Sequence, residues 1–397
     1  MSEHPKHGQT LSDTRLVKVM ALKDLDSELM SRALELGAGG DPTPNPHAGA
    51  LIADADGNII AEGFHQAAGL DHAAVVALKK AGAAARGKIL YVTLEPSNHT
   101  GRMPPCVDAI LAAGISRVVI GCRDPDPRVP GGGIERLEAA GVAVTVGVQE
   151  SAAKALIQPW AKYVTEHTSF VTLKLAISLD GRIATRTGAS KWITCPEARV
   201  KVQALRAHHD AVMVGINTVL TDNPRLTVRD VPGRNPIRVI VDSRLRIPLS
   251  SQVVETANEI PTCVVTTFAA PSSAEQALAH AGVRVIRVPA TAEGRCDPVV
   301  MFRELAAREV VSVMCEGGSE LAGSLLAHRL PDQLHVFVAP LLLGPRGRPG
   351  AVDWAGPENP GDAPRIDPAR WELCGTDAYV WGPIAYPKKT ARTMSGA

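Results

Sequence analysis

Short apolar runs alternate with helix-forming segments along most of this 397-residue chain, and the alternation constrains its fold more than any other feature. Strands followed by helices of about ten residues are typical of layered α/β domains. The alternation occurs in two blocks, residues 24–148 and 170–388, with a connector at 149–169 that Pro159 interrupts. We therefore expect two α/β domains, flanked by tails at 1–23 and 389–397.

The first block is predicted to be a three-layer domain. It opens with a helix that begins at Asp24 or Asp26 and ends at Gly37, followed by a hairpin that turns at Asp56-Gly57. The hairpin strands are 51–53 and 59–64, and the later helices and strands alternate as 72–81, 89–93, 105–113, 117–120, 134–140 and 142–146.

The second block is predicted to be a mostly parallel sheet covered by helices. Its first strand alternates strictly, with Val171, Leu173 and Leu175 on one face and Thr172 and Lys174 on the other. We expect the second face, which continues through 176, 178 and 180, to be a polar strip exposed beside a cleft. Further strands are expected at 211–214, 237–241, 263–267, 283–288, 310–315 and 334–339, and helices at 197–207, 274–281, 299–308 and 319–328. The last thirty residues either close the sheet edge or extend into solvent.

Charge and composition exclude several classes of protein. Forty-two Lys and Arg against 41 Asp and Glu leave a net charge of +1, so no global field attracts nucleic acid or an anionic membrane. The longest apolar run, 334–343, is far shorter than the ~20 residues of a membrane span. The N-terminal residues show no secretory signal, and seven scattered cysteines without a CxxC pair fit reduced thiols. We expect a cytoplasmic protein that binds neither nucleic acid nor membrane, and a charged small substrate is compatible with this composition.

Four segments of the first block, 44–46, 63–65, 69–74 and 94–106, resemble the zinc deaminase half of the bifunctional riboflavin-biosynthesis deaminase/reductase family (RibD type). The resemblance implies a cytidine-deaminase-like domain. In that family a His-Ala-Glu motif supplies a zinc ligand and a proton-shuttling glutamate, and two cysteines complete the site. Three protein ligands leave zinc an open position for water, and the glutamate moves protons between that water and the leaving amine.

The sequence departs from this motif at two essential positions. It keeps His72 and Cys106, but Ala74 stands where the family has the glutamate and Ser97 where it has the first cysteine. A serine hydroxyl is a poor replacement for a thiolate on zinc, and alanine carries no proton. We therefore expect a degenerate deaminase domain without zinc, in which His72 is an ordinary helix-terminal histidine and Cys106 a small buried thiol.

An alternative is a rebuilt metal site in which His99 or His47 joins His72 and Cys106. Such a site would hold a metal and still lack the proton shuttle. Ala50, where the family usually has cysteine, is a further departure.

A series of blocks in the second half, 173–184, 187–194, 205–207, 210–215, 217–229 and 315–319, resembles the reductase half of the same family. With the first half, the resemblance covers essentially residues 25–345. It implies a dihydrofolate-reductase-like fold and NADPH-dependent reduction of 5-amino-6-(5-phosphoribosylamino)uracil to its ribitylamino form. It also implies a homo-oligomer, which we expect to be a dimer.

The resemblance assigns site residues of two kinds. Substrate contacts are implied for Ser190, Arg206, Leu226, Arg229 and Glu316, and cofactor contacts for Ala176, Trp192, Thr218, Asp222, Gly318, Ser319, Glu320, Leu321, Ala322, Gly323 and Ser324. Gln203 replaces a histidine that the family often shows.

The residue types fit these roles. Arg206 and Arg229 carry planar forks suited to a phosphate, although each taken singly fits an ion pair equally well. The turn that contains Gly318 leaves backbone N–H groups free to meet a cofactor phosphate. Hydride transfer needs orientation more than acid or base catalysis, so no triad is expected. Lys174 and Asp222 are our candidates for polarising the ribose C1′ as its ring opens, with a structural salt bridge as the alternative.

Three functions compete. The first is a reductase with a degenerate deaminase domain; the second is a bifunctional enzyme that also deaminates diaminohydroxyphosphoribosylaminopyrimidine through a displaced zinc site; the third is a non-catalytic nucleotide-binding homologue. Ala74 argues against the second, and the joint retention of Lys174, Ser190, Arg206 and Glu316 argues against the third. We predict the first.

Overall fold

The computed structural model describes residues 10–100, 103–129, 131–344 and 350–387, with side chains from residue 22 onward, and divides into two units, Met1–Glu166 and His167–Ala397. The division falls inside the expected connector, which folds as two helices, α5 (Glu150–Leu156) and α6 (Gln158–Glu166). Pro159 lies in the first turn of α6, where its missing N–H costs nothing. Residues 389–397, predicted to be a tail, lie outside the described residues.

The first unit is built on a five-stranded sheet with strand order β2-β1-β3-β4-β5. Its strands are β1 (Gly49–Ala53), β2 (Ile59–Phe64), β3 (Ile89–Leu94), β4 (Arg117–Cys122) and β5 (Ala143–Val146). Strand β1 pairs antiparallel with β2 and β3, and β3, β4 and β5 run parallel. The predicted hairpin is therefore confirmed.

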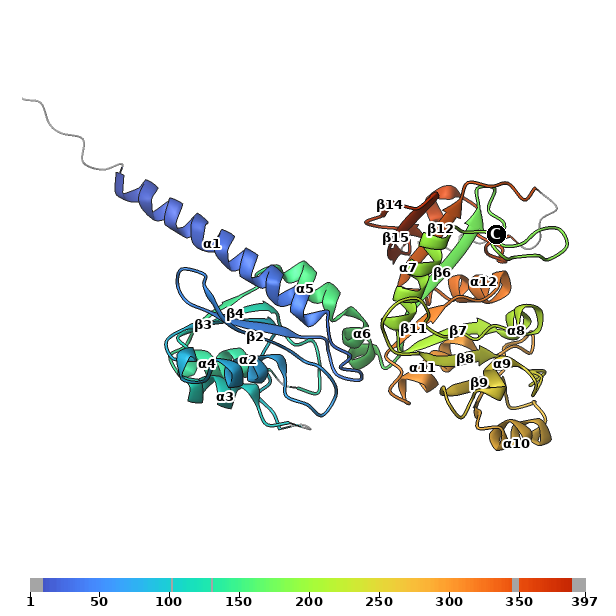
Figure 1. Ribbon diagram of the computed structural model, residues 1–397, viewed down its shortest axis with the longest axis horizontal. Coiled ribbons are helices and arrows are strands. Elements are labelled where there is room, and N and C mark those ends of the chain that lie inside the picture. The colour runs from blue at the N-terminus through green and yellow to red at the C-terminus, as the bar shows by residue number, and fades with distance from the viewer. Residues whose placement is uncertain (1–9, 101–102, 130, 345–349, 388–397) are drawn as a thin grey trace, which may run out of the picture. The chain divides into compact units, whose positions relative to one another are not determined.

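Helices cover both faces of this sheet (Figure 1). Helices α2 (Ala73–Ala81), α3 (Cys106–Ala113) and α4 (Gly133–Ala139) lie on one face, and α1 (Thr10–Gly37) and α5 lie on the other. The alternation of β1 explains the layering, because Ala50 and Ile52 pack into the cluster beneath α2 whereas Leu51 and Ala53 pack under α1. The predicted three layers are present.

The predicted start of the first helix is wrong. Helix α1 begins at Thr10, and Asp26 lies inside it as a buried residue rather than as a cap. Its carboxylate accepts a hydrogen bond from the Tyr91 hydroxyl at 2.8 Å and pairs with Arg117 at 2.6 Å. An aspartate with partners on β3 and β4 does not need to end the helix, and these long-range partners are invisible in the local sequence.

The second unit contains a sheet with strand order β10-β9-β8-β7-β11-β6-β12-β15-β13, to which β14 adds beside β15. The parallel strands are β6 (Phe170–Ser178), β7 (Ala211–Gly215), β8 (Ile237–Val241), β9 (Thr262–Thr267), β10 (Arg284–Val288), β11 (Ser312–Cys315) and β12 (Gln333–Ala339). Antiparallel strands β13 (Arg365–Ile366), β14 (Arg370–Cys374) and β15 (Asp377–Ala385) close the edge beside β12.

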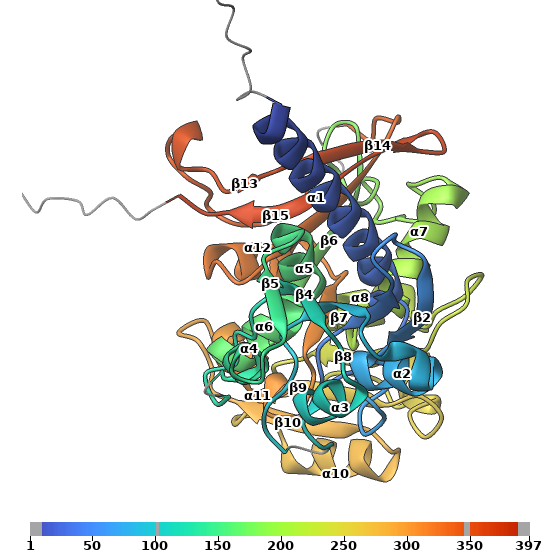
Figure 2. The same cartoon turned by 90° about the vertical axis from the view of Figure 1, so that its left-hand side faces the viewer.

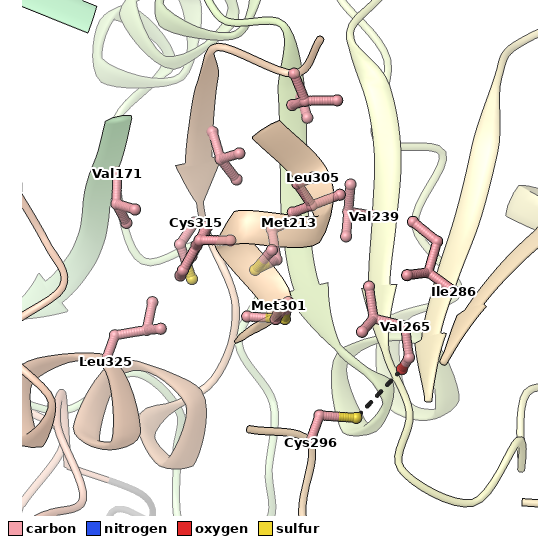
Figure 3. Close-up of a cluster of buried hydrophobic side chains, with 14 of the residues drawn as sticks. Val171, Met213, Val239, Val265, Ile286, Cys296, Met301, Leu305, Cys315 and Leu325 are labelled. Atoms are coloured by element: carbon pink, nitrogen blue, oxygen red, sulfur yellow. Dashed lines mark hydrogen bonds between the residues drawn. The ribbon is translucent and has the colours of Figure 1, made fainter. Parts of the chain in front are cut away.

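Helices again cover both faces. One face carries α11 (Pro298–Ala306) and α12 (Ser319–Ala327), whose Met301, Leu305 and Leu325 pack with apolar side chains of the parallel strands (Figure 3). The other carries α7 (Pro196–Ala207), α8 (Ile216–Asp222), α9 (Gln252–Glu255) and α10 (Ser272–His280). Figure 2 shows the helices and strands from a second direction. All seven cysteines are free thiols, and no helix of the described residues has the length and apolar character of a membrane span.

The predicted polar strip of β6 is only partly exposed. Strand β6 is central, between β11 and β12, and α7 packs over the face that carries Thr172. Thr172 and Ser178 are consequently buried, and the Thr172 hydroxyl hydrogen-bonds with His209 Nε2 at 2.8 Å. Lys174 and Ala176 of the strip line the pocket described below.

Candidate active site

A pocket of about 730 Å³ lies at the carboxyl ends of β6, β7 and β11, where ligands bind in open parallel sheets. Eleven of the predicted reductase residues line it, although they come from segments spread over more than 140 positions of the sequence. They are Lys174, Ala176, Ser190, Trp192, Arg206, Thr218, Asp222, Leu226, Arg229, Glu316 and Gly318.

A buried ion triad lies in the wall of the pocket. Glu316 directly follows β11 and forms a bidentate pair with Arg206, using Arg206 Nε and, at 3.0 Å, Nη2. Lys174 on β6 reaches the same carboxylate, with Nζ 3.2 Å from Oε2. Burial by itself would raise the pKa of Glu316, but the charges of Arg206 and Lys174 lower it to about 2. The carboxylate is therefore ionised at neutral pH and holds both cations in place.

The triad gives Arg206 and Lys174 the ion-pair partners that were one of the alternatives for each. Arg206 uses Nε and Nη2 on Glu316, and its Nη1 donates to the Thr227 carbonyl at 2.9 Å. The fork expected to hold a phosphate is thus engaged with a carboxylate. Lys174 likewise forms the ion pair that was the alternative to a catalytic role, while still lining the pocket.

Asp222, the second catalytic candidate, belongs to a separate group. It is the last residue of α8, one turn after Thr218, and its carboxylate accepts a hydrogen bond from the Ser190 hydroxyl at 3.4 Å. Its carbonyl accepts from Lys191 Nζ at 3.3 Å. Lys174 and Asp222 therefore line the same pocket with different partners.

The loop 223–229 forms part of the pocket wall in a conformation that needs support. Asn223 and Leu226 have φ values of 40° and 54°, a region that side-chain-bearing residues adopt at a cost. Gln252 on α9 holds the start of the loop: its Nε2 donates to the Asn223 carbonyl at 2.6 Å and its Oε1 accepts from Arg225 Nε at 2.9 Å. Gln203 on α7 holds its end, because Gln203 Oε1 accepts the backbone N–H of Arg229 at 3.1 Å.

Sequence reasoning missed Arg199. It lines the pocket, its guanidinium lies 4.6 Å from the centre of the Trp192 ring, and its Nη1 donates to the Thr194 carbonyl at 2.7 Å. The sequence contains a pattern that could have predicted this position. Arg199, Gln203 and Arg206 follow the four- and three-residue spacing of one helix face. That face of α7 turns toward the pocket.

The two glycines after β11 have different surroundings. A Cβ on Gly317 would lie 2.7 Å from the Gly215 nitrogen and from Val214 Cα, so this glycine permits close packing of two turns. A Cβ on Gly318 would meet nothing within 4 Å, and Gly318 lines the pocket. Gly318 is therefore the glycine that leaves the backbone accessible to a ligand.

The cofactor residues predicted beyond Gly318 do not line the pocket. Ala322 is fully buried in the core shown in part in Figure 3, and a Cβ on Gly323 would lie 1.9 Å from the Asp353 carbonyl oxygen. Glu320 pairs with Arg295 at 2.8 Å. Helix α12 packs on the sheet, and this packing directs most side chains of its first two turns away from the cavity. Ser319, Leu321 and Ser324 also do not line the pocket.

The pocket fits a dinucleotide phosphate cofactor. Its lining carries five cations, Lys174, Lys191, Arg199, Arg206 and Arg229, against three carboxylates, Asp222, Asp230 and Glu316. The excess of positive charge suits an anionic ligand, the open turn at Gly318 admits a phosphate to the backbone, and the exposed ring of Trp192 offers an aromatic face.

The residues at the positions of the deaminase motif lie in the first unit. His72 caps α2, and its Nδ1 lies 3.1 Å from the Cys106 sulfur, while the backbone N–H of Cys106 donates to the Ser97 hydroxyl at 3.2 Å. Burial lowers the pKa of His72 and raises the pKa of Cys106, which disfavours both charged forms. Ala74 is buried in the hydrophobic cluster beneath the sheet.

These donors do not fit zinc. The position of the first cysteine offers the neutral hydroxyl of Ser97 in place of a thiolate. Across the described part of the chain, no three His, Cys, Asp or Glu side chains come together as a metal site. His47 Nδ1 instead lies 3.1 Å from the Gly37 carbonyl.

Comparisons with known proteins match both halves. Residues 23–122 match the cytidine and deoxycytidylate deaminase zinc-binding region, and residues 169–380 match the RibD C-terminal domain. The riboflavin biosynthesis protein RibD of Aquifex aeolicus is 41% identical over 326 residues, 81% of this chain and 89% of that protein. RibD of Escherichia coli is 40% identical over 356 residues, 86% of this chain and 94% of that protein.

Solved structures of RibD proteins are also similar to this chain. Acinetobacter baumannii RibD superposes with a TM-score of 0.81 at 34% identity, covering 91% of this chain and 99% of that chain. The deaminase/reductase of Thermotoga maritima superposes with a TM-score of 0.79 at 34% identity, covering 92% and 99%. The predicted fold class, a deaminase-like domain followed by a RibD reductase domain, is confirmed. The chain belongs to the RibD family of riboflavin-biosynthesis deaminase/reductases.

Proposed function

We propose that the unit His167–Ala397 reduces 5-amino-6-(5-phosphoribosylamino)uracil to the ribitylamino form with NADPH, and that the deaminase-like unit no longer deaminates. The observation that carries the reductase assignment is the convergence of eleven predicted site residues on one pocket. The Thermotoga maritima relative is named for both reactions, the deaminase and the uracil reductase. A homo-oligomer in the cytoplasm remains our expectation.

The chemistry divides between cofactor and protein. NADPH, when bound, supplies the hydride that reduces C1′ of the ribosyl group. The turn at Gly318 and the side chains of Trp192 and Thr218 would hold it. The protein orients the substrate and manages protons: the ring oxygen must gain a proton when the ribosylamine opens to an imine, and the exocyclic nitrogen must lose one and regain it on reduction. Lys174 is the proton donor that we assign to the ring oxygen, because Glu316 fixes its ammonium in the pocket wall.

Loss of deamination is supported by the side chains at the vestigial site. Ala74 provides no proton shuttle, and Ser97 offers a neutral hydroxyl where the family has a thiolate ligand. A reductase without its own deaminase requires a substrate that another hydrolytic deaminase has already produced.

A bifunctional enzyme is the second candidate. The match of residues 23–122 to the zinc-binding deaminase region favours it, and the chemistry at positions 74 and 97 opposes it. The third candidate, a non-catalytic homologue, would need a reason to keep Lys174, Arg206 and Glu316 joined in one buried triad beside a pocket.

The assay that tests the proposal follows the ribityl product by mass spectrometry, with NADPH and the deaminated substrate. We expect turnover by the natural chain and a fall of at least about a hundredfold in kcat for Lys174→Met, since general acid–base groups contribute 10²–10⁴-fold. Lys201→Met on α7, whose side chain pairs with Glu372 away from the pocket, is the matched control. Absence of turnover by the natural chain would refute the reductase assignment.

A further inference from the structure

Two of the seven cysteines lie next to each other in the second unit. The other five are buried, whereas Cys195 and Cys374 are half-buried. They are 179 residues apart in the sequence, yet the Cys195 thiol donates a hydrogen bond to the Cys374 carbonyl at 2.9 Å. Both side chains pack against one buried cluster, which contains Val202 and Tyr379. The fold therefore brings together the two thiols of the chain that are not buried.

The turn between β14 and β15 is attached to the start of α7. Cys195 is the N-cap residue of α7, and its backbone N–H donates to the buried carboxylate of Asp377 at 2.8 Å. Both the backbone and the thiol of Cys195 thus contact this turn. Cys374 lies on the same face of β14 as Glu372, which pairs with Lys201 on α7. The side chain of Cys374 is therefore directed toward the helix that Cys195 caps.

Cys195 also adjoins the wall of the pocket on both sides. Residues 191–194, which precede it, line the pocket, and so do Arg199 and Gln203 on α7. The carbonyl of Thr194 accepts a hydrogen bond from Arg199 Nη1 at 2.7 Å, which ties the segment before Cys195 to the helix after it. A change in the position of Cys195 therefore reaches the pocket through one peptide bond and through one turn of helix.

We propose that hydrogen peroxide converts Cys195 and Cys374 into a reversible disulfide, and that this bond weakens ligand binding in the pocket. The peroxide oxidises the Cys195 thiol to a sulfenic acid, and one water leaves. The Cys374 thiol then attacks the sulfenic sulfur, the S–O bond breaks as the S–S bond forms, and a second water leaves. Burial raises the pKa of the Cys374 thiol, which favours Cys195 as the first to react.

The disulfide changes the geometry at the start of α7. It needs a sulfur–sulfur distance of about 2.05 Å, whereas the Cys195 sulfur now contacts the Cys374 carbonyl oxygen. Cys195 must give up this hydrogen bond and turn toward the Cys374 sulfur, and the backbone attached to it moves as well. A displacement of about 1 Å in a binding site can cost about a hundredfold in rate, so a small movement of Thr194 and Arg199 is sufficient.

The test compares the full chain after treatment with hydrogen peroxide and after treatment with dithiothreitol. Peptide mapping by mass spectrometry should find, in the oxidised chain, the Cys195 and Cys374 peptides joined and lighter by two hydrogen atoms. The dissociation constant for NADPH should rise at least about tenfold on oxidation and return with dithiothreitol. The oxidised chain should melt no lower than the reduced chain, because a cross-link between distant residues restricts the unfolded state, and this excludes unfolding as the cause.

Two variants control for oxidation elsewhere. Cys195→Ser keeps a donor for the Cys374 carbonyl and removes the cross-link, so its NADPH affinity should not respond to peroxide. Cys122→Ser, in the first unit, keeps a donor for the Thr93 carbonyl and should respond as the natural chain does. Loss of NADPH affinity in peroxide-treated Cys195→Ser, absence of the joined peptides, or a cross-linked chain with unchanged affinity would each overturn the proposal.

The disulfide is independent of the proposed function, which supplies only the ligand used to measure its effect on the pocket. A reduced chain that does not bind NADPH would reject the cofactor of the proposed function. Hydrogen exchange of residues 191–206 then measures the effect of the disulfide without any ligand. These residues should exchange faster in the oxidised chain, because the start of α7 has moved, and equal exchange in the two forms would overturn the proposal.

Discussion

Arg206 and Glu316 lie 110 residues apart in the sequence and form a bidentate ion pair in the wall of the pocket, with 11% and 7% of their side chains exposed. Charges taken out of water at this depth need partners: without Glu316, Arg206 would be a buried, uncompensated cation, and without Arg206 the carboxylate would keep only Lys174. The pair therefore couples α7 to the carboxyl end of β11, and it orients the carboxylate that also holds Lys174.

Removing Arg206 should consequently destabilise the second unit. For Arg206→Met we expect the free energy of unfolding to fall by about 3 kcal/mol, the range found when one partner of a buried pair is removed. The control is Arg295→Met, which breaks the half-exposed pair with Glu320 and should cost less than about 1 kcal/mol. Denaturant unfolding of both variants measures the difference, and equal losses would show that the buried pair contributes no more than a surface pair.

The same ion pair predicts that the free energy of unfolding decreases at acid pH. The pKa of Glu316 is lowered from 4.5 to about 2, so its contribution to stability is fully present above pH 4.5 and is lost as the pH falls toward 2. In Glu316→Gln this dependence should be absent, and stability measured between pH 5 and 2 should fall less steeply than in the natural chain. If the stability of both proteins fell equally steeply with pH, other carboxylates would dominate the loss of stability in acid.

The two glycines after β11 should respond oppositely to substitution. Gly318→Val should abolish or strongly weaken NADPH binding while the apo melting temperature stays near that of the natural chain, because the added side chain enters open space in the pocket. Gly317→Ala should lower the melting temperature, since its Cβ would press against the backbone of Val214 and Gly215. Melting and cofactor titration on the same preparations separate the effects; a loss of stability in Gly318→Val in proportion to the loss of binding would leave Gly318 a structural glycine.

Gln252 should control substrate affinity from outside the pocket. Gln252→Ala removes the side-chain bonds to Asn223 and Arg225, so the loop 223–229 loses its anchor at one end while α9 remains. We expect KM for the substrate to rise about tenfold, the equivalent of about 1.4 kcal/mol, with NADPH affinity nearly unchanged. Steady-state kinetics with each ligand varied in turn would show it, and an unchanged KM would mean that Gln203 and Arg206 suffice to hold the loop.

Metal binding and deamination should be recovered separately in the first unit. The natural chain should contain well below one zinc per chain. Ser97→Cys restores a thiolate ligand next to Cys106 and should raise the zinc content, whereas deamination should also require Ala74→Glu to supply the proton shuttle. Elemental analysis and deaminase assays of the single and double variants test this order, and stoichiometric zinc in the natural chain would contradict it.

Local pattern predicted most of the fold. The hairpin at Asp56-Gly57 and the parallel strands of the second unit follow from turn residues and apolar periodicity, and the structure places them within one or two residues of the expected bounds. The predictions that were wrong concerned residues whose partners are distant in the sequence. Thr172 is buried because α7 packs over β6, and α1 extends past Asp26 because Tyr91 and Arg117 satisfy its carboxylate.

The site was predictable to the extent that motif residues point into one cavity. Eleven did, and they come from strand β6, from helices α7 and α8, and from the loops that follow β6, α8 and β11. Residues 319–324 did not, since helix packing decides which way α12 faces. The pairing of Arg206 with Glu316 and the anchoring of the loop by Gln252 join segments that only the folded sheet brings together.

The central claim is that the second unit reduces its substrate and the first unit does not deaminate. It is tested most directly by supplying the purified natural chain and NADPH with the diamino substrate or with its deaminated form. The account predicts NADPH oxidation with the deaminated substrate, and none of the deaminated or ribityl uracil product from the diamino substrate until a separate zinc deaminase is added. Conversion of the diamino substrate to the ribityl uracil product by the chain alone would contradict it and would show that the vestigial site still works.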